Sequence, residues 1–130
     1  GEERVRVKVW FLFFVLYAPL TSAGDISGVW KHIDEPGWIE ISLEEGNATV
    51  IRNDTFPERV GREILKELNA DESTENLWHG QVFAEKLGEY KSAEISLKSP
   101  SLLQFKVKVG FMSRTIEWVR EDAQRSLEKN

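Results

Sequence analysis

The sequence predicts a mainly β protein, a small antiparallel barrel or sandwich with one short helix. Residues 102–120 contain two runs in which apolar and polar residues alternate, joined by a short connection around Gly110. This pattern is typical of an antiparallel hairpin. Shorter runs precede it, separated by residues that favour turns. Because a lone hairpin is only marginally stable in water, the earlier strands are expected to cover its apolar face.

Length and composition narrow the class of protein. The chain has 130 residues, 41% of them hydrophobic, which is enough for one domain with a buried core. Its formal net charge is -5 and its basic residues are spread out, which argues against nucleic acid as a partner. The sequence contains no cysteine, which excludes a disulfide framework, a thiolate metal site and a cysteine nucleophile.

The N-terminal segment has the pattern of a secretory signal peptide. A basic lead at residues 4–8 is followed by an apolar run at 9–17 and by small residues at 21–23. We therefore expect a signal peptide at residues 1–23, a barrel domain at 24–130, and a periplasmic or secreted protein. The apolar run is shorter than a transmembrane span, so no stable membrane anchor is expected after cleavage. The alternative is that this run is a buried strand or helix of the domain.

The first part of the domain is predicted to be a meander of three strands. Residues 28–32 form the first strand, which ends at the turn-like stretch 34–37. Residues 38–43 alternate between apolar and polar side chains, and a shorter third strand follows at 48–52.

A helix is predicted over residues 58–68. The preceding Thr55-Phe56-Pro57-Glu58 matches a capping box with a proline in the first turn. Val60, Ile64 and Leu68 recur every four residues, which is typical of one apolar helical stripe.

The strand pattern then returns. Residues 77–84 and 90–97 are predicted strands, and Gly80 within the first of them indicates a bulge or a close approach of another backbone. Together with the hairpin at 102–120, about seven strands are expected, and this number favours an antiparallel barrel or sandwich.

Two motifs at opposite ends of the domain suggest how such a barrel closes. Gly28-Val29-Trp30 resembles the Gly-x-Trp that opens the first strand of lipocalin-type barrels, and Arg120 lies near the end of the last strand. The resemblance implies that Arg120 packs across Trp30, with Gly28 beside them, as a cation–π pair that closes one end. The expected fold is therefore a small antiparallel lipocalin-like β-barrel with one short helix.

The order of short motifs along the domain is more specific. It resembles the secreted bacterial family catalogued as domain of unknown function 2147, whose members look lipocalin-like. The resemblance implies the fold but no activity, since the family has none assigned. It covers residues 25–120 and is carried by Gly28-Val29-Trp30, Gly61-Arg62-Glu63-Ile64-Leu65-Lys66, Trp78-His79-Gly80, Gly88-Glu89-Tyr90 and Arg114-Thr115-Ile116-Glu117-Trp118-Val119-Arg120.

The aromatic residues provide the candidate ligand site. Trp38, Phe83, Tyr90 and Phe105 are predicted to line a cavity for a small apolar or amphipathic ligand. The alternative is that they simply fill the core, because a small eight-stranded barrel either holds one small ligand or is packed with side chains.

The tip of the last hairpin provides a second candidate. Phe111 and Met112 lie there, and apolar residues at a tip either fold back as a lid or contact a partner. The alternative function is therefore a protein-interaction module, such as an inhibitor or an envelope-associated factor, that binds a protein partner and no small molecule.

Catalytic chemistry is not expected. The only histidines, His32 and His79, would suit a metal if the barrel brought them together with a carboxylate, but no ligand spacing favours this over two unrelated imidazoles. No nucleophile motif or triad signature is present. We therefore predict no catalytic residue, no metal and no cofactor, and a protein that is not an enzyme.

Overall fold

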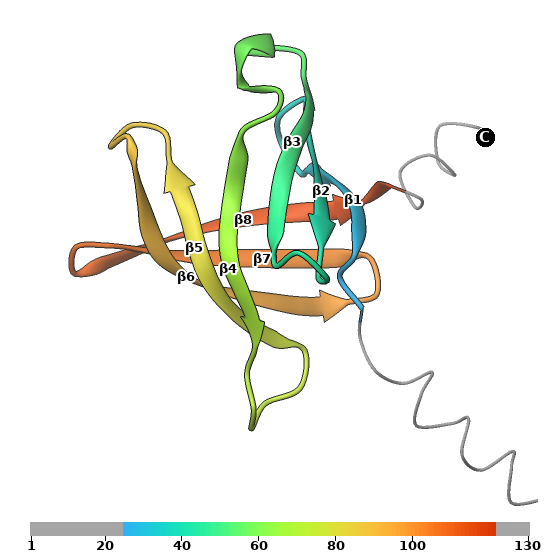
Figure 1. Cartoon of the computed structure of the whole chain (residues 1–130), viewed down its shortest axis with the longest axis vertical. Helices are drawn as coiled ribbons and strands as arrows, with labels where there is room; N and C mark the ends of the chain where they lie inside the picture. Colours follow the sequence, from blue (N-terminus) through green and yellow to red (C-terminus); the bar gives the residue numbers. More distant parts are fainter. Residues whose placement is uncertain (1–24, 122–130) are drawn as a thin grey trace, which may run out of the picture.

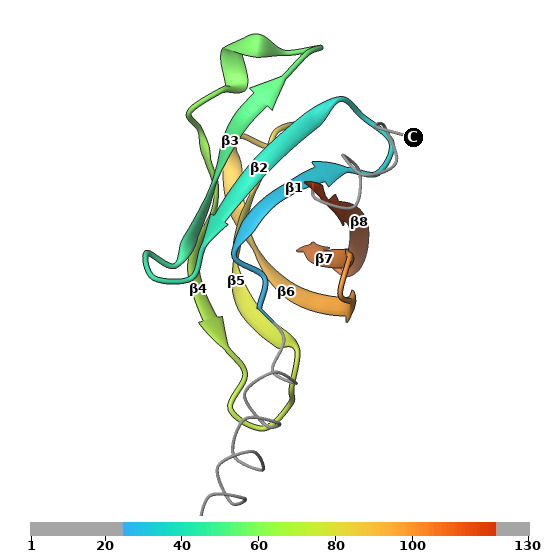
Figure 2. The same cartoon turned by 90° about the vertical axis from the view of Figure 1, so that its right-hand side faces the viewer.

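The computed structural model describes residues 25–121, which form a closed barrel of antiparallel strands (Figures 1 and 2). Each strand pairs with the next along the chain, and the last returns to pair with the first. The strands are β1 (Gly28–His32), β2 (Gly37–Ser42), β3 (Asn47–Asn53), β4 (Glu63–Ala70), β5 (Leu77–Ala84), β6 (Glu89–Ser99), β7 (Leu102–Val109) and β8 (Met112–Arg120). The predicted mainly β antiparallel barrel is thus confirmed, while the predicted signal peptide at 1–23 lies outside the described residues.

The strands expected from the alternating runs are present within about two residues of their predicted bounds. The short connection predicted around Gly110 is a two-residue turn, Gly110–Phe111, across which Val109 pairs with Met112. Gly110 has a φ of 65°, which glycine adopts without strain at the first position of such a turn.

The predicted helix at residues 58–68 is wrong. This stretch contains a single 3-10 turn, η2 (Pro57–Arg59), and then strand β4. The pairing of β4 with β5 is irregular between Lys66 and Asn69, and Glu67 has a φ of 54°. This bulge turns Leu68 to the same side as Leu65, so that both are buried although they are three positions apart, an odd spacing that would place them on opposite faces of a regular strand. A spacing of three between buried leucines imitates a helical stripe.

Gly80 lies across from this bulge and confirms the predicted close approach. A Cβ atom at this position would lie 3.0 Å from the Leu65 side chain and 3.1 Å from the Lys66 carbonyl oxygen. A side chain here would therefore push the bulged part of β4 away from β5.

The core fills the middle of the barrel. Its members come from all eight strands and from the segment that precedes β1. The largest fully buried side chains are Trp30, Phe105, Ile26, Ile39, Ile41, Leu65, Ile95 and Leu103.

The connections separate the barrel into two ends. The β1–β2, β3–β4, β5–β6 and β7–β8 connections share what we call the open end, and the last three lie at the top and left of Figure 1. The β2–β3, β4–β5 and β6–β7 connections and residues 25–27 share the closed end. Within the described part of the chain, no helix is long and apolar enough to cross a membrane.

Candidate functional site

At the closed end, the side chain of Arg120 packs over the indole ring of Trp30. The guanidinium carbon of Arg120 lies 4.4 Å from the ring centre of Trp30. The same guanidinium donates hydrogen bonds to the carbonyl oxygens of Pro100 at 2.8 Å, Asp25 at 2.8 Å and Ser27 at 3.4 Å. Arg120 therefore ties the β6–β7 turn and the segment before β1 to the end of β8.

Trp30 itself is fully buried, and its Nε1 donates a hydrogen bond to the Ile26 carbonyl at 2.9 Å. Gly28 has a φ of 118°, a conformation that residues with a Cβ rarely adopt, and its missing Cβ would lie 3.9 Å from Arg120. The structure thus brings together Gly28, Trp30 and Arg120, as the Gly-x-Trp motif implied.

The open end contains a cavity of about 560 Å³. Its inner wall is apolar because strand alternation directs most of these side chains inward. The apolar lining side chains come from six of the strands: Ile39, Val50, Ile64, Val82, Phe105, Val107, Val109, Ile116 and Trp118. Ile64 is the exception to the alternation: it lies next to the buried Leu65, where the register between β3 and β4 shifts.

Two aromatic residues and one histidine meet at the inner part of this cavity. Trp118 is 6% exposed, and its ring centre lies 5.4 Å from that of Phe105 and 5.2 Å from that of His32, which it meets edge-on. Its Nε1 is buried and makes no hydrogen bond with any described residue. A buried donor in this state costs about 1–3 kcal/mol.

His32 is held in one tautomer. Its Nδ1 accepts hydrogen bonds from the backbone N–H groups of Asp34 at 3.0 Å and Glu35 at 3.1 Å. Because Nδ1 is the acceptor, the proton of the neutral ring lies on Nε2. The β1–β2 connection thus fixes the orientation of the ring at the cavity.

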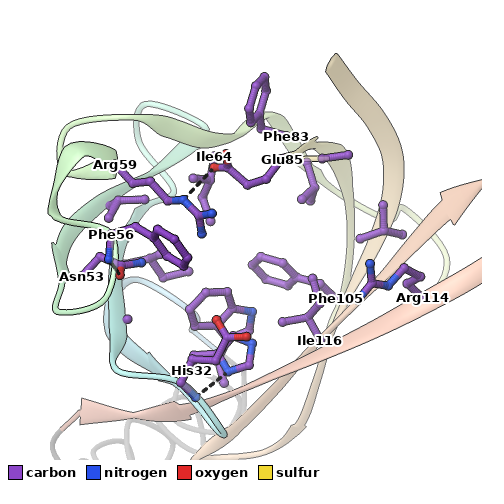
Figure 3. Close-up of a pocket in the computed structure, with 18 of the residues that line it drawn as sticks. His32, Asn53, Phe56, Arg59, Ile64, Phe83, Glu85, Phe105, Arg114 and Ile116 are labelled. Atoms are coloured by element: carbon purple, nitrogen blue, oxygen red, sulfur yellow. Dashed lines mark hydrogen bonds and ion pairs between the residues drawn. The ribbon is translucent and has the colours of Figure 1, made fainter. Parts of the chain in front are cut away.

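The mouth of the cavity is bounded by the β3–β4 and β5–β6 connections (Figure 3). Phe56 lines it from the β3–β4 side, where its backbone N–H donates to the Asn53 side chain at 2.7 Å. Glu85, on the β5–β6 side, forms ion pairs with Arg59 at 3.7 Å and with Arg62. One carboxylate therefore joins the two connections across the mouth.

Arg114 reaches the cavity from β8. It is paired with Val107 of β7 and shares its face of the strand with Ile116 and Trp118. Figure 3 shows it beside Phe105 and Ile116. It is therefore a cationic group on an otherwise apolar wall.

The four aromatic residues predicted to line the cavity take different positions. Phe105 is fully buried in the wall. Phe83 also borders the cavity, at the edge of the group in Figure 3, with its ring directed away from Phe105. It packs against Tyr90 at 5.2 Å between ring centres and under the Arg62 guanidinium at 5.0 Å.

Tyr90 is not part of the cavity lining. Its hydroxyl donates to the Glu63 carbonyl at 2.6 Å, and the Lys66 ammonium lies 4.0 Å from its ring centre. Tyr90 is therefore engaged on the outer face of the sheet, beside Phe83.

Trp38 borders the cavity, but its ring is engaged elsewhere. The ring lies between the Arg52 guanidinium at 4.4 Å and the Lys31 ammonium at 5.7 Å, and its Nε1 donates to Glu121 at 3.0 Å. Trp38 shares its strand face with the exposed Glu40, while its neighbours Ile39 and Ile41 face inward.

The hairpin tip carries the two residues predicted to meet a partner. Phe111 is 99% exposed and Met112 is 61% exposed, so Phe111 is not folded back onto the barrel as a lid. Whether they bind a protein stays a prediction.

The two histidines lie at different places. His32 borders the cavity, whereas His79 on β5 contacts Asp71 of the β4–β5 turn, Nε2 to Oδ2 at 2.7 Å. Among the described residues, no group of three or more His, Asp and Glu side chains is arranged to hold a metal.

Several cavity residues escaped the sequence reasoning. Arg59 and Glu85 belong to two connections that lie close together in the folded protein, and no sequence pattern predicts that proximity. Val107, Ile116 and Arg114 are different: they share the inward parity of Phe105 and Trp118 along the last hairpin. Following that parity would have found them.

Fold and site together define a closed eight-stranded barrel with an apolar cavity at one end. Comparisons of the chain with models of known protein families, with curated proteins and with solved structures found no match.

Proposed function

We propose that the protein binds a small, mainly apolar ligand in the cavity at the open end. The observation that carries this proposal is the cavity of about 560 Å³ with an apolar wall. Ligand sites in proteins have volumes of about 300–1,000 Å³ and are lined mainly by apolar and aromatic side chains. An eight-stranded barrel is also about the smallest that leaves room for one small ligand.

The contrast with the closed end supports the proposal. There the interior is filled by Trp30 and Ile26, which are both fully buried. The cavity described above lies at the open end instead. Its wall includes Trp118, whose buried Nε1 makes no hydrogen bond with any described residue, and loops bound its mouth.

Location belongs to the proposal as well. A periplasmic or secreted, lipocalin-like binding protein is what the signal pattern at residues 1–23 and the resemblance to domain of unknown function 2147 suggest. N-terminal sequencing of the protein recovered from the producing cells tests this location: we expect it to begin at Gly24.

A neutral fluorescent probe, N-phenyl-1-naphthylamine, tests the binding itself. Ile116→Trp places a larger side chain in the cavity, and Thr115→Trp places the same side chain on the exposed opposite face of the same strand. We expect saturable enhancement of the probe's own emission with the unaltered protein and with Thr115→Trp, and at least tenfold weaker binding with Ile116→Trp. Absence of saturable binding, or equal binding by both variants, would contradict the proposal.

A second candidate function, a protein-interaction module, is favoured by the exposed tip. β1 pairs with β8 from Trp118 to Arg120, and the Ile33 N–H also donates to the Glu117 carbonyl at 3.0 Å. The β8 segment 112–116 lies beyond this pairing and presents a strand edge next to the exposed Phe111. Such an edge can accept an added strand from a partner. A photo-crosslinking residue at position 111, compared with one at position 108, tests this in the native compartment. The same products at both positions would contradict it.

A further inference from the structure

Among the described residues, two cationic side chains of the cavity lining form no ion pair: Lys86, at the mouth, and Arg114, on the wall. Arg114 lines the cavity, and within residues 25–121 it forms no ion pair. Arg59, the other arginine of the lining, is held by Glu85 at 3.7 Å and lies 3.9 Å from the ring centre of Phe56. Arg114 is therefore the arginine of the lining that is open to a further acceptor.

The residues that line the cavity carry a net positive charge, whereas the whole chain carries a net negative charge. The cationic lining residues are Arg59, Lys86 and Arg114, and the carboxylates are Glu35 and Glu85, which leaves one positive charge in excess. The whole chain carries a formal charge of -5. A positive site on an acidic protein favours an anion at that site over the rest of the surface.

The position of Arg114 along β8 determines how much apolar wall lies between its charge and the inner end of the cavity. Ile116 and Trp118 follow it on the same face toward the inner end of the cavity. Four residues of strand cover about 13 Å. A molecule bound with its charged group at Arg114 would therefore have about this length of apolar wall for its body.

We propose that the ligand is an amphipathic anion, with a single apolar chain against the wall and its charged head at Arg114. This inference rests on the proposed ligand-binding function and specifies its ligand class. A guanidinium offers two parallel N–H donors that fit a carboxylate or a phosphate, whereas a hydroxyl or an amine cannot use both. Arg114 is thus the residue that determines specificity.

Calorimetric titration below the micellar concentration tests the proposal with four probes of equal chain length: dodecanoate, dodecyl phosphate, 1-dodecanol and dodecylamine. We expect dodecanoate or dodecyl phosphate to bind the unaltered protein about tenfold or more tightly than the alcohol. The two anions together distinguish a carboxylate head from a phosphate head, and a preference for either supports the anionic class.

Variants of two cationic residues on the same hairpin provide the decisive comparison. Arg114→Gln should lose the preference for the anion while it still binds the alcohol. Lys108→Gln removes an equal charge from the exposed opposite face of β7 and should keep the preference. Arg114→Lys should keep part of it.

The outcomes separate the two proposals. Equal binding of anion and alcohol by the unaltered protein, or a similar loss in Arg114→Gln and Lys108→Gln, overturns the anionic head but leaves ligand binding intact. Tighter binding of the amine overturns it as well. Failure of all four probes to bind overturns ligand binding itself and the inference with it.

Discussion

The two ends of the barrel differ in the hydrogen bonding and packing of their buried tryptophans. At the closed end Trp30 is fully buried, donates its N–H to a carbonyl and is covered by a guanidinium that itself makes three hydrogen bonds. At the open end Trp118 is nearly as buried, but its N–H has no hydrogen-bond partner in residues 25–121 and it borders a cavity. Proteins tend to depart from full satisfaction and dense packing at functional sites. The difference therefore assigns stability to the closed end and supports the proposed ligand binding at the open end.

Removing the side chain of Trp30 should have the largest effect on stability. Trp30→Ala is expected to lower the free energy of unfolding by about 3–5 kcal/mol, because it leaves a large cavity in the core. Trp38→Ala removes the same side chain from the outer face, where it is only partly buried, and should cost about 1–2 kcal/mol. Urea denaturation measures both. Equal losses would contradict the assignment of stability to the closed end.

Arg120→Met should have the next largest effect and lower the free energy of unfolding by about 2–3 kcal/mol. The variant keeps most of the apolar stem but removes the cation–π contact with Trp30 and the donors to three carbonyl oxygens. Arg120→Lys retains the charge without the planar fork, so it should recover less than half of the loss. Full recovery by lysine would show that charge alone explains the contribution.

A matched pair of substitutions compares the two tryptophans directly. Trp30→Phe leaves the Ile26 carbonyl without its donor, whereas Trp118→Phe removes a donor that makes no hydrogen bond. We expect Trp30→Phe to be more destabilising than Trp118→Phe by about 1–2 kcal/mol, measured by chemical denaturation. The reverse order would mean that the Trp118 N–H has a partner when the protein is in solution.

The smallest expected effect is a pH dependence of the folding stability, which arises from Asp71 in the β4–β5 turn at the closed end. Hydrogen bonds from His79, first, and from Ser73 and Thr74 hold the pKa of the Asp71 carboxyl well below its usual range. Folding thus favours the ionised form. The resulting stabilisation is complete above the unfolded-state pKa of about 4 and is lost as the pH falls toward the folded-state value.

Thermal unfolding of Asp71→Asn and of the unaltered protein measures this contribution. The difference in midpoint should be constant down to about pH 5 and shrink as the pH falls below about 4. Glu72→Gln, which removes the adjacent exposed carboxylate, serves as the control. A difference that persists unchanged in acid would show that the Asp71 carboxylate does not stabilise the fold.

Much of the fold was predictable because strand alternation and turn residues are local signals. β1 and β5 have the predicted bounds, and the Gly80 close approach is where the sequence indicated it. β4 was not predictable, because its bulge depends on pairing with β5. Leu65 and Leu68 face the core together only when the neighbouring strand accommodates Glu67 in its positive φ.

The candidate site was predicted less well, and the reason is visible along the strands. Aromatic character was used to choose Trp38, Phe83 and Tyr90. The alternation of their strands directs all three rings outward, so that Trp38 and Phe83 only border the cavity and Tyr90 does not line it. Phe105 has the inward parity of Leu103 and Val107 and does lie in the wall. In a barrel, parity along the strand is thus a better guide to the cavity than residue type. The contact between the loops at Glu85 needed the folded arrangement.

That contact has a consequence for kinetics. Glu85 joins the β3–β4 and β5–β6 connections through Arg59 and Arg62, whose side chains are 26% and 34% exposed. Salt screens such pairs, since the Debye length falls from about 10 Å at 0.1 M to about 3 Å at 1 M. If the mouth must widen to admit a ligand, both association and dissociation should accelerate with ionic strength. A neutral ligand would then exchange faster in concentrated salt at an almost unchanged affinity.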